Sequence, residues 1–140
     1  MNETTDTAHG TFQIRLTPHA PTPDAAPEIA RLHFTKAWAG DLSGEGRGEM
    51  LSVCDPASGA AAYVVLETFT GTLAGRTGSF AFQQFGTMQP STVQGGAVTL
   101  TYTVVPGSGR GELAGLSGTL TLMREGGEHR YGLAYVLGEP

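Results

Sequence analysis

Hydrophobic and polar side chains alternate along several short stretches of the chain, which is typical of strands with one buried face. In residues 11–17, Phe12, Ile14 and Leu16 share one face, and residues 98–104 alternate apolar side chains with threonines. This pattern predicts eight strands, near residues 11–17, 29–39, 48–53, 60–70, 76–88, 98–104, 119–123 and 129–137.

The segments between these strands have the composition of loops and turns. Residues 18–27 contain four prolines, residues 40–46 are rich in Gly and Ser, and shorter turn sequences lie at 55–59, 71–75, 89–95 and 125–128. A helical period is not sustained anywhere, although residues 112–116 could form a single turn. Strands joined mostly by hairpins favour a closed up-and-down barrel, because closure removes exposed sheet edges. A two-sheet β-sandwich is the alternative.

Glycine-rich motifs recur along the chain. The sequences Gly40-x-Leu42-Ser-Gly, Gly71-x-Leu73-Ala-Gly and Gly111-x-Leu113-Ala-Gly predict a reused turn whose leucine plugs one end of the barrel. Residues 44–48 and 107–111, Gly-Glu-Gly-Arg-Gly and Gly-Ser-Gly-Arg-Gly, resemble phosphate-binding loops. Neither opens a helix, as a dinucleotide loop must, so both are interpreted as turns.

Length and charge restrict the function further. The 140 residues fit one domain, expected at residues 9–138 after a disordered polar tail at 1–8. The net charge is −5 and basic residues are scattered, so nucleic acid is not an expected partner. No apolar segment suggests a membrane or a leader, and a cytoplasmic location is expected. Cys54, the single cysteine, is expected to be buried, and no cofactor or metal is predicted because the four histidines lack ligand spacing.

Pairing the predicted strands through their turns gathers polar groups on the inner face. Placing Gly71 near Arg76 sets Glu67 opposite Phe80, and with Phe80 and Phe82 inward, the side chains of Tyr63, Glu67 and Gln84 also face inward. Placing Cys54 opposite Ala60 sets Glu49 opposite Val65, on the same inner face.

Glu49 and Glu67 then become diagonal neighbours on adjacent strands, about 7–8 Å apart. Two interior carboxylates would hold a proton near neutrality and could act as an acid/base pair, which makes them the candidate catalytic residues. The alternatives are that they lie in water at the barrel mouth, or that a shift of one residue in register turns them outward.

Five stretches, together with a weaker match from Gly10, resemble a bacterial family known as domain of unknown function three-two-two-four. They are Gly-Arg-Gly-Glu-Met-Leu-Ser (46–52), Ala-Tyr-Val-Val-Leu-Glu (62–67), Thr-Gly-Thr-Leu-Ala-Gly-Arg-Thr-Gly-Ser-Phe (70–80), Gly-Thr-Met (86–88) and Gly-Glu-Leu-Ala-Gly-Leu-Ser-Gly (111–118). The resemblance implies an eight-stranded, calycin-like barrel similar to that of allene oxide cyclase. It also implies a histidine where this chain has Gln84.

Three classes of function are left open, because one barrel shape supports unrelated functions. The first is the binding of a small, largely apolar ligand in the barrel. Its predicted ligand-binding residues are Tyr63, Glu67, Phe80, Phe82, Gln84 and Tyr102. The second is a cofactor-free isomerase or cyclase that uses Glu49 and Glu67. The third is a barrel with a filled core that acts through its surface or as a homo-oligomer, since eight strands enclose either packed side chains or one small ligand.

Overall fold

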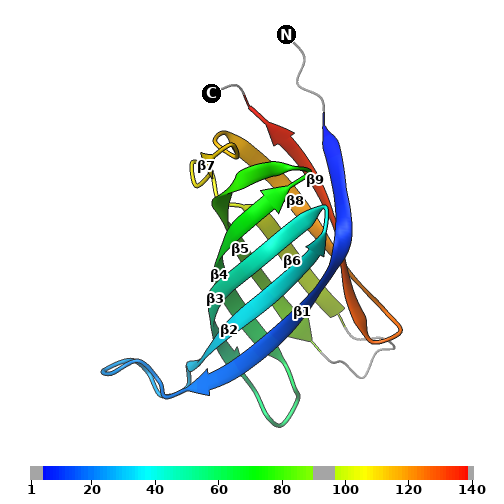
Figure 1. Ribbon diagram of the computed structural model, residues 1–140. Coiled ribbons are helices and arrows are strands. Elements are labelled where there is room, and N and C mark those ends of the chain that lie inside the picture. The colour runs from blue at the N-terminus through cyan, green and yellow to red at the C-terminus, as the bar shows by residue number, and fades with distance from the viewer. Residues whose placement is uncertain (1–4, 90–96, 139–140) are drawn as a thin grey trace.

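The chain folds into a closed antiparallel β-barrel, seen in a computed structural model that describes residues 5–89 and 97–138. Each long strand pairs with the next one along the chain, and β1 pairs with β9 to close the barrel (Figure 1). The two-residue strand β7 is an addition at the edge of β5. The strands are β1 (Asp6–His19), β2 (Ala30–Gly40), β3 (Leu42–Cys54), β4 (Ala61–Leu73), β5 (Arg76–Gln89), β6 (Ala97–Val104), β7 (Arg110–Gly111), β8 (Leu116–Glu125) and β9 (Glu128–Leu137).

The predicted eight-stranded up-and-down barrel is therefore confirmed, and the differences concern where strands begin. β1 begins at Asp6, and Ala8 is fully buried opposite Leu133, so the expected polar tail does not reach residue 8. Residues 112–115 form successive tight turns, Leu116 begins β8, and no described residue is helical. Cys54 is exposed at the end of β3, contrary to expectation. Residues 1–4 and most of the predicted loop at 89–95 lie outside the described residues.

The largest difference is in β3, which begins six residues before the predicted strand. Residues 42–47, expected to belong to a loop, pair with β4, and residues 44–47 pair with β2 as well. The Gly-Glu-Gly-Arg-Gly motif is therefore a strand segment, which presents Gly44, Gly46 and Gly48 to the interior and Glu45 and Arg47 to solvent. The interpretation of this motif as a turn was wrong.

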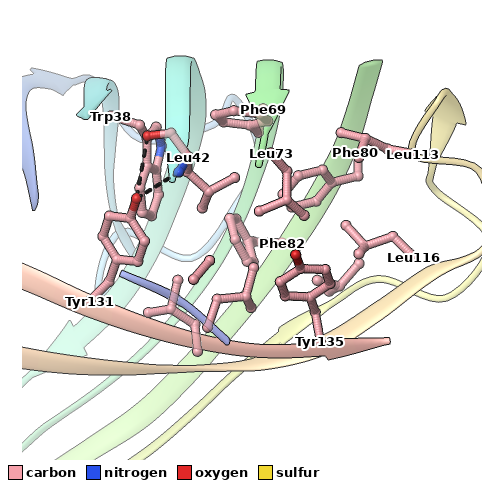
Figure 2. Packing of buried hydrophobic residues seen from close by; sticks show 14 of the residues in the cluster. Trp38, Leu42, Phe69, Leu73, Phe80, Phe82, Leu113, Leu116, Tyr131 and Tyr135 are labelled. Atoms are coloured by element: carbon pink, nitrogen blue, oxygen red, sulfur yellow. Dashed lines mark hydrogen bonds between the residues drawn. The ribbon is translucent and has the colours of Figure 1, made fainter. Parts of the chain in front are cut away.

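One end of the barrel is plugged by three leucines. Leu42, Leu73 and Leu113, the central residues of the repeated Gly-x-Leu motifs, are each completely buried, as predicted. Figure 2 shows them packed among buried aromatic rings. The hydroxyl of Tyr131 accepts a hydrogen bond from the backbone N–H of Leu42 at 2.8 Å and donates to the carbonyl of Ala39 at 3.0 Å. A side chain on β9 thus holds the turn between β2 and β3.

The hairpin loops between β1 and β2 and between β3 and β4 lie at the other end of the barrel. The start of β1, the end of β9 and β7 lie at the plugged end, and the loop between β1 and β2 extends from the opposite end (Figure 1). Among the described residues there is no helix of the length and apolar character needed to span a membrane.

The plug predicts a large difference between two leucines of β4. Leu73→Ala should lower the free energy of unfolding by about 2–5 kcal/mol, because it leaves a cavity among fully buried side chains. Leu66→Ala, on the outer face of the same strand, should change it by less than about 0.5 kcal/mol, because Leu66 is 64% exposed. Urea unfolding of both variants is the measurement. Equal losses would contradict this assignment of the core.

Candidate functional site

The open half of the barrel contains a cavity of about 470 Å³ that is open to solvent. This volume lies within the range of roughly 300–1,000 Å³ that small-molecule sites occupy. Its walls are largely apolar and come from most strands of the barrel, with Ile14, Leu32, Met50 and Leu122 among them. The polar groups that reach it are Lys36, Tyr63, Gln84, Arg124 and His129.

A network of buried polar side chains lies between this cavity and the plugged half. The ammonium of Lys36 donates to Oε1 of Glu67 at 3.0 Å and to the hydroxyl of Tyr102 at 2.8 Å. Tyr102 donates to the same carboxylate oxygen at 3.2 Å, and the indole N–H of Trp38 donates to Oε2 at 3.0 Å. Lys36 is 5% exposed and Glu67 is 1% exposed. Both oxygens of the carboxylate therefore have partners.

The network crosses the barrel from wall to wall. Lys36 and Trp38 lie on β2, Glu67 on β4 and Tyr102 on β6. Because eight long strands form the ring, β2 and β6 lie four places apart and face each other across the interior. The link from Lys36 to Tyr102 thus joins opposite walls, and Glu67 braces it from the wall between them.

Glycines on β3, the strand between β2 and β4, make room for this network. A Cβ atom on Gly46 would lie 2.2 Å from Oε2 of Glu67 and 2.8 Å from the indole nitrogen of Trp38. A Cβ atom on Gly48 would lie 2.3 Å from the ring of Phe34, a wall residue of the cavity. The inward glycines of the Gly-Glu-Gly-Arg-Gly motif are therefore needed for space.

Burial sets the protonation behaviour of the network. Loss of solvent lowers the pKa of the Lys36 ammonium from its ordinary value, while the nearby Glu67 carboxylate opposes this shift. Burial, followed by the negative charge of Glu67, raises the pKa of Tyr102 well above its ordinary value. The Lys36 ammonium also lies 4.5 Å from the ring centroid of Phe12, and the π-electrons of that ring favour the positive charge.

The cavity wall and its rim carry further polar groups. The side-chain amide of Gln84 donates to the hydroxyl of Tyr63 at 3.0 Å. The ring of His129 stacks on Phe12, with centroids 5.0 Å apart. Burial and the positive charges of Arg124 and Lys36 lower the pKa of His129, which favours its neutral form.

The structure places most of the predicted site residues inside the barrel. Tyr63 and Gln84 line the cavity, and Glu67 and Tyr102 lie beneath it. Phe80 and Phe82 also point inward but pack in the plugged half (Figure 2). The predicted pairing of β4 with β5 was wrong by two residues, since Glu67 pairs with Phe82. A register shift of two residues keeps every side chain on the same face of the sheet, so the predicted inward orientation of Tyr63, Glu67 and Gln84 is correct despite the error.

The interior position expected for Glu49 was wrong. Cys54 pairs with Ala61 and Glu49 with Leu66, one residue away from the predicted register, and an odd shift exchanges the faces. Glu49 lies on the outer surface, where its carboxylate is 3.3 Å from Nε2 of His33 and 3.9 Å from Arg31. Glu67 is thus the buried carboxylate among the described residues, and the acid/base pair that the sequence predicted is not formed.

The sequence analysis missed Lys36, the most informative residue of the site. The alternation in β2 puts position 36 on the same inner face as Phe34 and Trp38, and this signal was available. A lysine is rarely buried without a partner, however, and its partner Glu67 lies 31 residues away on β4. Within the part of the chain that the structure describes, no three His, Cys, Asp or Glu side chains are grouped to hold a metal.

Fold and site together define an eight-stranded up-and-down barrel that is plugged at one end and open at the other. The family model for a protein of unknown function, DUF3224, matches residues 8–135, and the chain belongs to this family. It is also similar to a crystal structure of a DUF3224 protein of unknown function from Shewanella oneidensis MR-1. The two chains are 34% identical, the match covers 98% of this chain and 100% of the other, and the TM-score is 0.85. A search of curated proteins found no match.

The space beside Glu67 can be tested at Gly46. Gly46→Ala should lower the free energy of unfolding by about 1–3 kcal/mol, because the added methyl group overlaps two hydrogen-bonded side chains. Gly132→Ala is the matched control, also in a strand, where the nearest atom to the new Cβ lies at an ordinary 3.6 Å. That change should be neutral or stabilising by up to about 1 kcal/mol. Similar effects of both changes in thermal unfolding would contradict this assignment of space.

Tyr102 should make stability depend on pH in the alkaline range. Its pKa in the folded protein lies above the unfolded value of 10.0, so the folded state retains a proton that the unfolded state loses. The contribution of Tyr102 to the free energy of unfolding is therefore present below pH 10, and it is lost as the pH rises toward the folded-state pKa. The free energy of unfolding, measured from about pH 9 to about pH 11, should therefore fall more steeply in the wild type than in Tyr102→Phe.

Lys36 acts in the opposite sense, because its lowered pKa favours folding as the pH rises toward 10.5. It is present in both proteins, so the difference between the two profiles reports Tyr102. Parallel profiles would show that the Tyr102 hydroxyl ionises as in an exposed tyrosine.

Proposed function

We propose that this protein binds a small, largely apolar ligand in the open half of its barrel. The observation that carries the proposal is the cavity of about 470 Å³, whose apolar walls end at a buried polar network. A barrel whose core was filled throughout would leave no such space. Apolar walls with a few converging polar groups are the usual composition of a small-molecule site.

The arrangement of polar groups also supports a binding role. Tyr63 and Gln84 are hydrogen-bonded to each other on one wall, and Lys36 is held by Glu67 and Tyr102 at the base. Side chains held in this way lose little freedom when a ligand arrives, which favours affinity. Because Glu49 is outside the barrel, no specific observation favours the isomerase or cyclase alternative.

Titration with the neutral dye Nile red tests the proposal. The single tryptophan, Trp38, lies in the network beneath the cavity, so its fluorescence should change on binding together with that of the dye. We expect saturable binding with one dye per chain. Absence of saturation, or binding of many dyes per chain, would contradict the proposal.

A double variant locates the bound dye. Met50 and Leu122 line the cavity from β3 and β8, which face each other in the ring, so Met50→Phe with Leu122→Phe narrows the cavity from both sides. This variant should bind at least about tenfold more weakly, a loss of about 1.4 kcal/mol. Leu66→Phe, which adds similar bulk on the outer face, is the control and should bind as the wild type does. Equal binding by all three proteins would place the dye outside the barrel.

A further inference from the structure

The chemistry at the base of the cavity defines one end of its ligand. Of the four network residues, Lys36 alone reaches the cavity, since the described residues that line it do not include Trp38, Glu67 or Tyr102. An ammonium group has three N–H donors. Two of them bond to Glu67 and Tyr102, which leaves one for an acceptor in the cavity.

The charge balance at this point disfavours an acidic ligand group. Lys36 and Glu67 form a neutral pair, and the nearest ammonium–carboxylate distance is 3.0 Å. A ligand carboxylate beside Lys36 would bring a second negative charge to a single ammonium inside a poorly solvated site. Like charges that share such a site repel strongly, and one of the two carboxylates would have to take up a proton. An uncharged oxygen accepts the same hydrogen bond without this cost.

The surrounding rings restrict how Lys36 can respond. Its ammonium lies 4.5 Å from the ring centroid of Phe12 and 5.2 Å from that of Phe34, and both rings line the cavity. Rotation of Lys36 toward a ligand would break its two hydrogen bonds and leave Glu67 without its cationic partner. The ligand acceptor must therefore reach the Lys36 ammonium in its present position.

We infer that the inner end of the ligand carries an uncharged oxygen acceptor, of the ketone or ester class, which accepts the remaining N–H of Lys36. This inference rests on the proposed function, because it concerns the same cavity. It makes Lys36 the residue that recognises the ligand and Glu67 the residue that excludes acids from its inner end.

Three probes with closely similar apolar chains test the inference. Methyl nonyl ketone carries a carbonyl, decanoate replaces the methyl group beside that carbonyl with a charged oxygen, and undecane has no acceptor. Arg124 is exposed and also lines the cavity, so a carboxylate could bind there in reversed orientation. The titrations are therefore repeated in Arg124→Gln, with Trp38 fluorescence and calorimetry as readouts.

In Arg124→Gln at neutral pH, the ketone should bind at least about tenfold more tightly than decanoate, and also more tightly than undecane. Decanoate binding as tightly as the ketone would overturn the inference, and so would undecane binding as tightly as the ketone. If none of the three probes, nor Nile red, binds saturably to the wild type, the proposed function itself fails.

Glu67→Gln supplies an independent measurement. It keeps the shape of the side chain but leaves Lys36 with an unbalanced positive charge, so the preference should reverse in favour of decanoate by at least about tenfold. An unchanged preference in a folded Glu67→Gln protein would overturn the role of Glu67. If this variant does not fold, the comparison of the three probes in Arg124→Gln still decides the inference.

Discussion

The ion pair between Lys36 and Glu67 is the interaction on which the organisation of this barrel depends. Removing two charges from water costs several kcal/mol for each ion, and mutual attraction offsets this only when further hydrogen bonds satisfy both groups. Here Tyr102 and Trp38 supply those bonds, and Phe12 lies close to the ammonium. Hydrophobic residues of similar volume often stabilise such a position at least as well as a buried ion pair does. The proposed role of Lys36 in ligand recognition would give a physical reason for charges in this place.

The network also separates the two halves of the barrel. Toward the start of β1 and the end of β9, leucines and aromatic rings pack the interior, and Trp38 packs against both Phe82 and Tyr131. At the opposite end, where the loop between β1 and β2 lies, the walls stand apart and leave the cavity between them. The inward glycines of β3 allow both arrangements, because they provide the volume that Glu67, Trp38 and Phe34 occupy.

The fold could be predicted from the sequence because strand alternation is a local property. Phe12, Ile14 and Leu16 indicate their strand without knowledge of its neighbours, and the leucine of each Gly-x-Leu motif indicated the plug. Prediction of the site depended on the register between neighbouring strands, and this register is set by the geometry of the loops that join them. An error of two residues left Glu67 and Gln84 inside, whereas an error of one residue in the next hairpin misplaced Glu49.

Lys36 illustrates a second limit. The inward position of Lys36 followed from alternation, but a buried lysine is acceptable only with a partner. Its partners lie on β4 and β6, and only closure of the ring brings these strands within reach of β2 across the interior. No local pattern contains that information. The Gly-Glu-Gly-Arg-Gly motif was misread for a related reason, because glycines that provide space for distant side chains look in sequence like glycines that form turns.

The start of β1 and the end of β9 lie at the same end of the barrel, which makes the two ends of the molecule different. Asp6 at the start of β1 pairs with Tyr135 near the end of β9, beside the plug and away from the cavity mouth. A tether joined through either strand end, to a surface or to another folded unit, would therefore approach the sealed side of the barrel. The opening would face away from whatever the barrel is attached to, free to exchange molecules with its surroundings.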